Sequence, residues 1–243
     1  MRLLAGPPPT SPLQRASSGR LRGGPSIWDR RAWKAIFSTA ALPAVLLIAV
    51  FGVVFAAQMT NGGPLPWGLS GQALEEGRWH TLASHMVTHG GLAHLFMNSS
   101  VLLALTPLVM MRLGSGLAAW LRYGVLFAAS GLAGAALYLA IHPAGVVPMV
   151  GASGAIFGLW GAAARVGPDG AMVSLMSAQV RSEVIAVAKM NLILFVILFA
   201  LVRISGGVGG LAWEAHIGGF LFGLLVMPLL APRAVAAPGP ATG

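Results

Sequence analysis

Three short motifs in this sequence carry side chains that act together in hydrolases. Ser153 lies in the run G-A-S-G at the head of an apolar segment. His216 lies in a second glycine-rich apolar segment, and an imidazole can take the proton of a serine hydroxyl. His94 and Asn98 are four residues apart, on one face of a helix, and both can donate hydrogen bonds. The sequence therefore offers a nucleophile, a base and two donors for an oxyanion.

Each motif also has a plain structural interpretation. Small residues around Ser153 are enriched wherever membrane helices touch, so that motif alone is more typical of packing than of catalysis. Asn98 suits an amide contact between helices, and His216 suits a helix-bonding histidine. An ionisable residue within a membrane span is nevertheless a functional-site hypothesis by default.

Glycine spacing favours the catalytic interpretation. At about 100° per residue, one stripe of glycines runs beside Ser153 and another runs close to the face of His216. Two smooth stripes allow two helix backbones to approach, which brings the serine hydroxyl to the imidazole. The predicted helix-packing glycines are Gly151, Gly154, Gly158, Gly219 and Gly223.

Composition indicates an integral membrane protein. Of the 243 residues, 56% are hydrophobic and only 9% are charged, whereas a soluble domain carries roughly 25% charged residues. The net charge of +9 is concentrated before Ala35 without interleaved aromatic residues, so we expect no nucleic-acid partner. The absence of cysteine excludes disulfides, a thiolate nucleophile and a thiolate metal site.

Apolar runs predict an all-α membrane protein with six transmembrane helices. The expected membrane domain covers residues 31–231, between a disordered basic tail at 1–30 and a disordered tail at 232–243. The expected spans are 35–57, 92–113, 117–141, 150–165, 184–204 and 214–230.

The distribution of Lys and Arg predicts the orientation. With six spans and a cytoplasmic N-terminus, all cationic residues but Arg78 and Arg203 fall on the cytoplasmic side. Both termini are then cytoplasmic, and the three motifs lie toward the outer face of the plasma membrane. The fourth span is short, so we expect Ser153 below the membrane surface, reached by non-helical backbone that lines a cavity.

A catalytic triad and a metal site are the alternatives to a serine–histidine dyad. Glu214 is two residues from His216, about 200° around a helix, so it points away and does not complete a triad. His85, His89 and His94 lack the H-E-x-x-H spacing and a nearby carboxylate, so no metal site is predicted and structural hydrogen bonds are the alternative for the first two.

With these motifs in order and at one depth, the sequence resembles the rhomboid family of intramembrane serine proteases, over about Ala35 to Leu230. The resemblance rests on H-x-x-x-N at His94, G-x-S-G at Ser153 and A-H-x-x-G-x-x-x-G at His216. It implies a six-helix bundle without cofactor that cleaves single-pass transmembrane proteins within the bilayer.

The resemblance also implies residue roles. Ser153 is the expected nucleophile and His216 its general base and acid, while His94 and Asn98 form the oxyanion hole. The fifth helix and the glycine-rich run from Ser205 to Gly210 are the expected lateral gate for substrate.

Two other classes of protein remain as alternatives. A catalytically inactive rhomboid-like protein would bind client transmembrane helices without cutting them. A transporter would be expected to show inverted repeats or a charged residue at mid-membrane, and neither is evident.

Overall fold

The computed structural model of the chain describes residues 39–205 and 210–232. The described part is helical, and its only β pairing consists of two isolated bridges. Six helices form the body: α2 (Leu42–Thr60), preceded by the 3₁₀ turn η2 (Thr39–Ala41), α5 (Leu92–Leu113), α6 (Gly116–Ile141), α7 (Ser153–Ala164), α8 (Ala178–Ser205) and α9 (Trp213–Leu230). The predicted all-α membrane fold is thereby confirmed.

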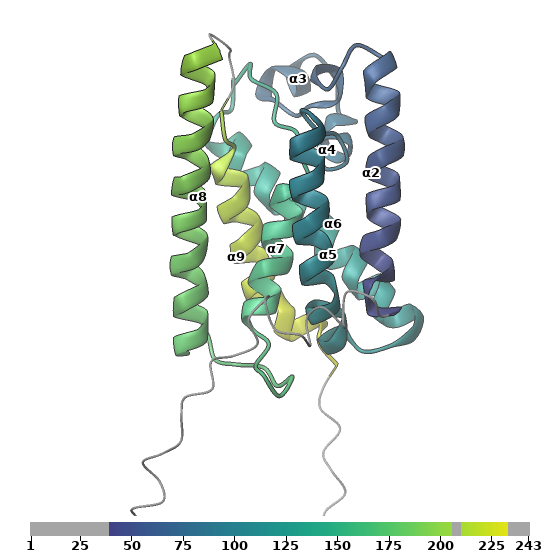
Figure 1. Cartoon of the computed structure of the whole chain (residues 1–243), viewed down its shortest axis with the longest axis vertical. Helices are drawn as coiled ribbons and strands as arrows, with labels where there is room; N and C mark the ends of the chain where they lie inside the picture. Colours follow the sequence, from purple (N-terminus) through teal and green to yellow (C-terminus); the bar gives the residue numbers. More distant parts are fainter. Residues whose placement is uncertain (1–38, 206–209, 233–243) are drawn as a thin grey trace, which may run out of the picture.

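Helix α7 lies at the centre of the bundle. Nine of its twelve residues are buried, because α5, α6 and α9 pack around it (Figure 1). Its small residues allow close packing on several sides at once, which is how membrane helices associate without a hydrophobic driving force between them. Whatever α7 carries is therefore enclosed by three other helices.

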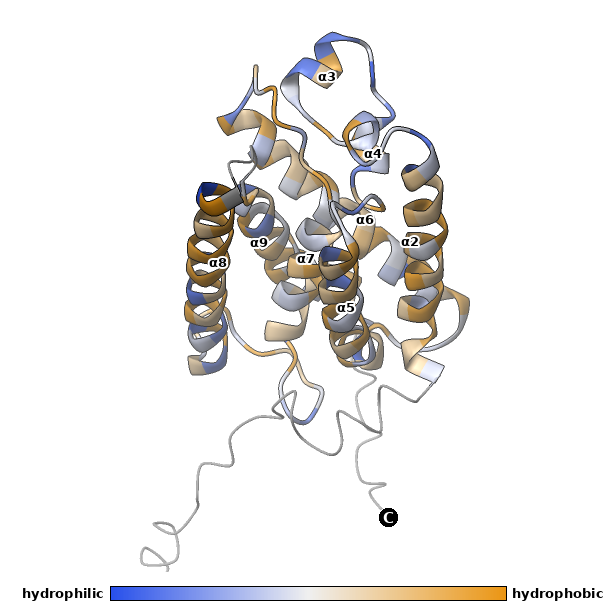
Figure 2. Cartoon of the chain, turned by 45° about the horizontal axis from the view of Figure 1, so that its top comes forward, coloured by the Kyte–Doolittle hydropathy of each residue, from blue (hydrophilic) through white to orange (hydrophobic). Residues whose placement is uncertain are grey.

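Helices α2 and α8 are peripheral. Both are apolar over most of their surface, as the orange colouring in Figure 2 shows. In α8 the buried side chains are Val180, Val187 and Asn191, and none of the described side chains from 192 to 204 is buried. The half of α8 that follows Asn191 is thus scarcely packed against the rest of the chain.

Five of these helices are long and apolar enough to cross a bilayer, and α7 is the short one. Its twelve residues begin at Ser153, three residues later than the predicted span of 150–165. The preceding residues do not continue the helix, because Gly151 adopts a φ of +121°, which only glycine tolerates readily.

Other predicted boundaries differ at their ends. Helix α8 begins at Ala178 rather than at 184, since a helix continues past the apolar run into polar residues such as Arg181 and Glu183. Helix α2 ends at Thr60 rather than 57, while α6 and α9 each begin one residue before the predicted start. Helix α5 coincides with the predicted 92–113.

The loop between α2 and α5 folds over one end of the bundle. It contains η3 (Leu65–Trp67) and the short helices α3 (Gly71–Glu75) and α4 (Thr81–Ser84), which lie between α2 and α8 near their upper ends in Figure 1, and α3 is at the top of Figure 2. Leu69 and Met149 exchange both backbone hydrogen bonds, at 2.9 and 2.7 Å. This bridge satisfies the non-helical backbone that leads into α7, as a segment without helical hydrogen bonds requires.

Several predicted segments lie outside the described residues. They are the tail at 1–30, residues 233–243 of the tail predicted at 232–243, the first four residues of the first predicted span, and residues 206–209 of the predicted gate.

Candidate active site

Ser153 and His216 meet between α7 and α9. Ser153 is the first residue of α7, His216 lies in the first turn of α9, and the Oγ atom of Ser153 is 2.8 Å from Nε2 of His216. The imidazole is buried, with 2% of the residue exposed. This geometry is that of a hydroxyl nucleophile hydrogen-bonded to its base.

Glycines hold the two helices at the distance that this hydrogen bond needs. A Cβ atom at Gly219 would collide with the carbonyl oxygen of Gly154, and one at Gly223 would collide with that of Gly158. Helix α9 therefore packs directly on the backbone of α7. The four glycines lie in this contact, on the faces that their spacing in the sequence predicts.

Two further side chains surround the imidazole of His216. The Phe157 ring stacks on it, with the centroids 4.2 Å apart and the planes 6° from parallel. At the edge of the imidazole, the Nδ1 atom, which is the ring nitrogen that does not face Ser153, lies 2.8 Å from the Oδ1 atom of Asn191 in α8. Sequence reasoning did not single out Asn191, although a lone amide within an apolar run is a pattern that points to a buried partner.

His94 and Asn98 converge on the backbone just before Ser153. A Cβ atom placed on Gly151 would lie 2.7 Å from both Cε1 and Nε2 of His94 and 3.4 Å from Nδ2 of Asn98. The Gly90 N–H donates to Nδ1 of His94 at 3.4 Å, so the ring proton belongs on Nε2. Nδ2 of Asn98 is buried without a hydrogen-bond partner in the described part of the chain. Two donors thus face the approach to Ser153.

Gly151 has a different role from the one predicted. It precedes α7, its N–H donates to the carbonyl oxygen of His85 at 2.8 Å, and its missing side chain makes room for His94. The prediction that Gly151 packs two helices together is wrong, because the positive φ at this residue keeps it out of the helix.

Comparisons with known proteins agree with these motifs. The family model described as "Rhomboid domain" matches residues 76–233, more than half of the chain. The chain belongs to the rhomboid family. RHOMBOID-like protein 5 of Arabidopsis thaliana is 32% identical over 158 residues, and Rhomboid protease GluP of Bacillus subtilis (strain 168) is 31% identical over 184 residues. These alignments cover 65% and 72% of this chain, but only 46% and 33% of the respective relatives.

Membership of the rhomboid family, together with five membrane-length helices, makes this a multi-pass membrane protein. In Figure 1, α5 begins somewhat below the upper ends of α2 and α8, and α9 begins well below them. Because Ser153 is hydrogen-bonded to His216 in the first turn of α9, the start of α7 lies at that same level. His94 and Asn98 lie against Gly151, two residues before Ser153, so the three rhomboid motifs meet at one place in the bundle.

The two histidines before α5 support the fold around the site. Nδ1 of His85 donates to the carbonyl oxygen of Thr81 at 2.8 Å, and burial lowers the pKa of His85 below its usual value. His89 packs between Phe51 and His94, and neither of its ring nitrogens has a partner among the residues described. Burial and the neighbouring His94 lower the pKa of His89 to about 4. Both side chains are therefore neutral at physiological pH.

No metal-like cluster of three His, Cys, Asp or Glu occurs within residues 39–205 and 210–232. Among the described residues, the side chain of Glu214 forms no hydrogen bond with Ser153 or His216. Its carboxylate lies 2.7 Å from Nε2 of His142, which follows α6. The carboxylate thus belongs to a second pair at the start of α9 rather than to a triad.

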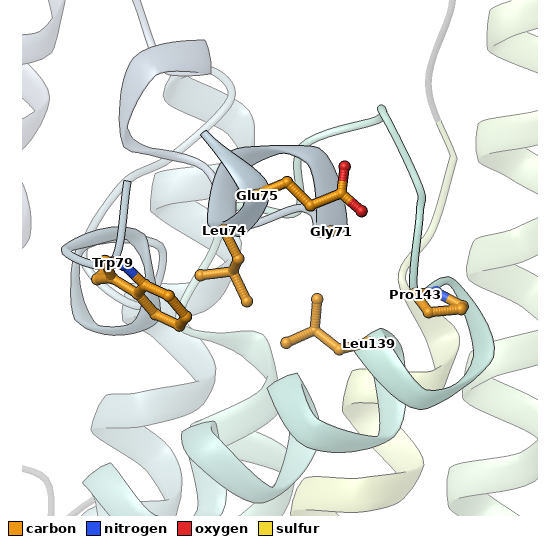
Figure 3. Close-up of a pocket in the computed structure, with 6 residues that line it drawn as sticks. All are labelled: Gly71, Leu74, Glu75, Trp79, Leu139 and Pro143. Atoms are coloured by element: carbon orange, nitrogen blue, oxygen red, sulfur yellow. The ribbon is translucent and has the colours of Figure 1, made fainter. Parts of the chain in front are cut away.

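A surface pocket of about 490 Å³ lies between the first loop and the end of α6. Leu74, Trp79 and Leu139 point toward its interior in Figure 3, and the carboxylate of Glu75 points away from them. None of the residues that line it belongs to the three motifs. The pocket is therefore separate from the candidate active site.

Proposed function

We propose that this rhomboid protein is an intramembrane serine endopeptidase that cleaves single-pass transmembrane proteins. The observation that supports this most strongly is the 2.8 Å contact between the Oγ atom of Ser153 and Nε2 of a buried His216. The name of the Bacillus relative, a rhomboid protease, supports the same activity. We also propose that residues 31–231 form the membrane domain that carries it.

The first half of the reaction forms an acyl-enzyme. Nε2 of His216 removes the hydroxyl proton while Oγ of Ser153 attacks the carbonyl carbon of the scissile peptide bond. The imidazolium then gives this proton to the leaving amine, and the C–N bond breaks. In the second half, His216 removes a proton from water as the water oxygen attacks the ester carbon. The bond from that carbon to Oγ then breaks, the imidazolium returns the proton to Oγ of Ser153, and the new carboxyl terminus is released.

Charge develops on the carbonyl oxygen during both attacks. The Nδ2–H group of Asn98 and the Nε2–H group of His94 donate hydrogen bonds to this oxyanion. Because the site is at the edge of the buried interior, these hydrogen bonds stabilise the charge more strongly than they would in water. A buried donor without a hydrogen-bond partner destabilises the resting protein. The unpaired Nδ2 of Asn98 is explained if it donates to the substrate oxyanion in the transition state.

Substrate helices enter from the side in this proposal. The half of α8 from 192 to 204 has no buried side chain among its described residues, so a transmembrane segment can pass it at little cost in packing. Peptide bonds in a helix are already hydrogen-bonded, so the substrate segment must unwind locally to present its carbonyl group to Ser153.

A fluorophosphonate probe tests the enzymatic function against an inactive binding protein. The probe forms a covalent bond only with an activated serine, so the wild-type chain in detergent should be labelled and Ser153→Ala should not. Ser100→Ala, which changes an exposed serine on α5, is the matched control and should be labelled like wild type. A folded wild-type chain that takes no label would contradict the proposal.

We further propose that the protein lies in the plasma membrane with both termini in the cytoplasm and Ser153 toward the outer face. The start of α2 and the end of α9 lie at the same end of the bundle, which supports an even number of crossings (Figure 1). Reporter fusions at each terminus should both read as cytoplasmic. Termini on opposite sides would rule out this topology.

A further inference from the structure

His216 makes two hydrogen bonds, one through each ring nitrogen. Nε2 faces Oγ of Ser153 and Nδ1 faces Oδ1 of Asn191, both at 2.8 Å. Asn191 is on α8, which otherwise contributes apolar side chains at this depth, and only 8% of the residue is exposed. A buried amide in an apolar helix is expensive unless it is fully hydrogen-bonded, so its partners indicate what it does.

A second hydrogen bond sets the direction of the Asn191 amide. Nδ2 donates to the carbonyl oxygen of Val187, one turn earlier in α8, at 3.0 Å. The NH₂ group is thereby assigned to the helix, and the oxygen of the amide faces His216. An oxygen that accepts from the ring requires a proton on Nδ1.

This proton decides whether His216 can act as a base. A neutral imidazole carries one ring proton, so a proton on Nδ1 leaves Nε2 with a free electron pair toward the hydroxyl of Ser153. In the opposite tautomer, Nε2 carries the ring proton. Its N–H would then face the hydroxyl of Ser153, and Nε2 could not accept the hydroxyl proton. The stacked ring of Phe157 fixes the plane of the imidazole, but it does not distinguish the two tautomers or a flip of the ring within that plane.

We propose that Asn191 is a positioning residue that holds His216 in its Nδ1–H tautomer and orients Nε2 toward Ser153. The inference rests on the proposed protease function and adds to it a third residue that acts through the base. Asn191 is also the last buried residue along the described part of α8. The hydrogen bond therefore lies where the packed half of that helix ends.

Kinetic measurements test this role. In proteoliposomes with a single-pass test substrate, Asn191→Leu removes the acceptor and keeps a side chain of similar size, so kcat should fall by about tenfold while KM stays within about twofold. Asn191→Asp retains an oxygen that can accept from Nδ1 and should recover most of the lost kcat. Leu121→Ala, which changes an exposed residue on α6 outside the site and the substrate path, is the matched control and should keep the wild-type kcat.

A spectroscopic readout separates tautomer control from a loss of packing. In protein with ¹⁵N-labelled histidine rings, the His216 signals, assigned by their loss in His216→Gln, should show Nδ1 protonated and Nε2 unprotonated. Asn191→Leu and the smaller Asn191→Ala should both convert this pattern into a mixture of tautomers, with melting curves showing which of the two is folded. Unchanged ring signals in a folded variant would overturn the proposal, and so would an equal loss of kcat in Leu121→Ala.

The same assays distinguish this inference from the function on which it rests. If Ser153→Ala abolishes cleavage while Asn191→Leu keeps full kcat and the Nδ1–H tautomer, the positioning role is wrong and the protease function stands. If Ser153→Ala still cleaves the substrate, the protease mechanism is wrong, whatever the ring signals of His216 show.

Discussion

Gly223 of α9 lies directly against Gly158 of α7, so closely that no Cβ atom fits between the two backbones. One turn nearer the start of each helix, Gly219 and Gly154 meet in the same way. Ser153 and His216 extend from the ends of these two helices. The distance between nucleophile and base is therefore set by the packing of four glycines.

Replacing Gly223 by alanine should destabilise the fold and lower activity. The new methyl group would meet the carbonyl group of Gly158, and a helix backbone cannot move as a flexible side chain does, so we expect a loss of about 3 kcal/mol in the free energy of unfolding. Unfolding in detergent measures this loss. Gly124→Ala in α6, where a Cβ atom would meet nothing, is the matched control and should change stability by less than about 1 kcal/mol. Equal effects of the two substitutions would show that the α7–α9 contact is not tight.

Asn98→Ala should lower turnover much more than substrate affinity. An oxyanion donor interacts most strongly with charge that exists only in the transition state, so kcat should fall by about 10²–10³ with little change in KM. Asn98→Asp should be worse, because a carboxylate would add negative charge where the oxyanion forms. Kinetics in proteoliposomes, beside a melting curve, measure both effects.

Met97→Ala controls for a change on the same turn of α5, since Met97 is half exposed and belongs to no motif. If both Asn98 variants keep wild-type turnover while folded, Asn98 is only a contact between helices. The oxyanion hole would then consist of His94 and backbone N–H groups.

The buried His89 should make stability depend on pH. Its pKa of about 4 in the folded chain lies below the unfolded value of roughly 6.5, so the folded state binds the proton more weakly. The stability is fully present above pH ~6.5 and is lost progressively as the pH falls to about 4, by up to ~3 kcal/mol. Burial lowers the pKa of His85 as well, so its contribution has the same sign.

Melting temperatures across this pH range test the role of His89. His89→Phe fills the same space with a ring that needs no hydrogen bond, so it should reduce the fall in melting temperature on acidification. His80→Gln, at an exposed position, controls for the loss of a histidine and should keep the wild-type dependence. If the slope is the same in His89→Phe and wild type, the acid sensitivity comes from other groups.

Local patterns in the sequence were sufficient to predict much of this arrangement. Helix α5 lies between Gly91 and Gly114, and its predicted and observed bounds coincide. The spacing of Gly219 and Gly223 places them on the face that meets α7, because helical periodicity depends only on neighbouring residues. The start of α8 was misplaced because hydropathy follows the apolar run, whereas the helix continues through Arg181 and Glu183.

Contacts between distant segments were not predictable in the same way. Asn191 and His216 are 25 residues apart, and His142 and Glu214 are 72 apart, so neither pair forms a motif in the sequence. The predicted span of 150–165 began before Gly151, because an apolar run does not reveal a positive φ. Such features depend on how the helices pack, which no single segment encodes.

The central claim is that Ser153 and His216 act as one catalytic unit, and cleavage by their single and double variants tests it most directly. Wild type, Ser153→Ala, His216→Ala and the double variant are reconstituted at equal amounts with a single-pass substrate, and product is quantified over time. Because the nucleophile is inactive without its base, each single variant should lose activity to background and the double variant should be no worse. A folded single variant that retains substantial cleavage, or a double variant far below both single ones, would contradict the account.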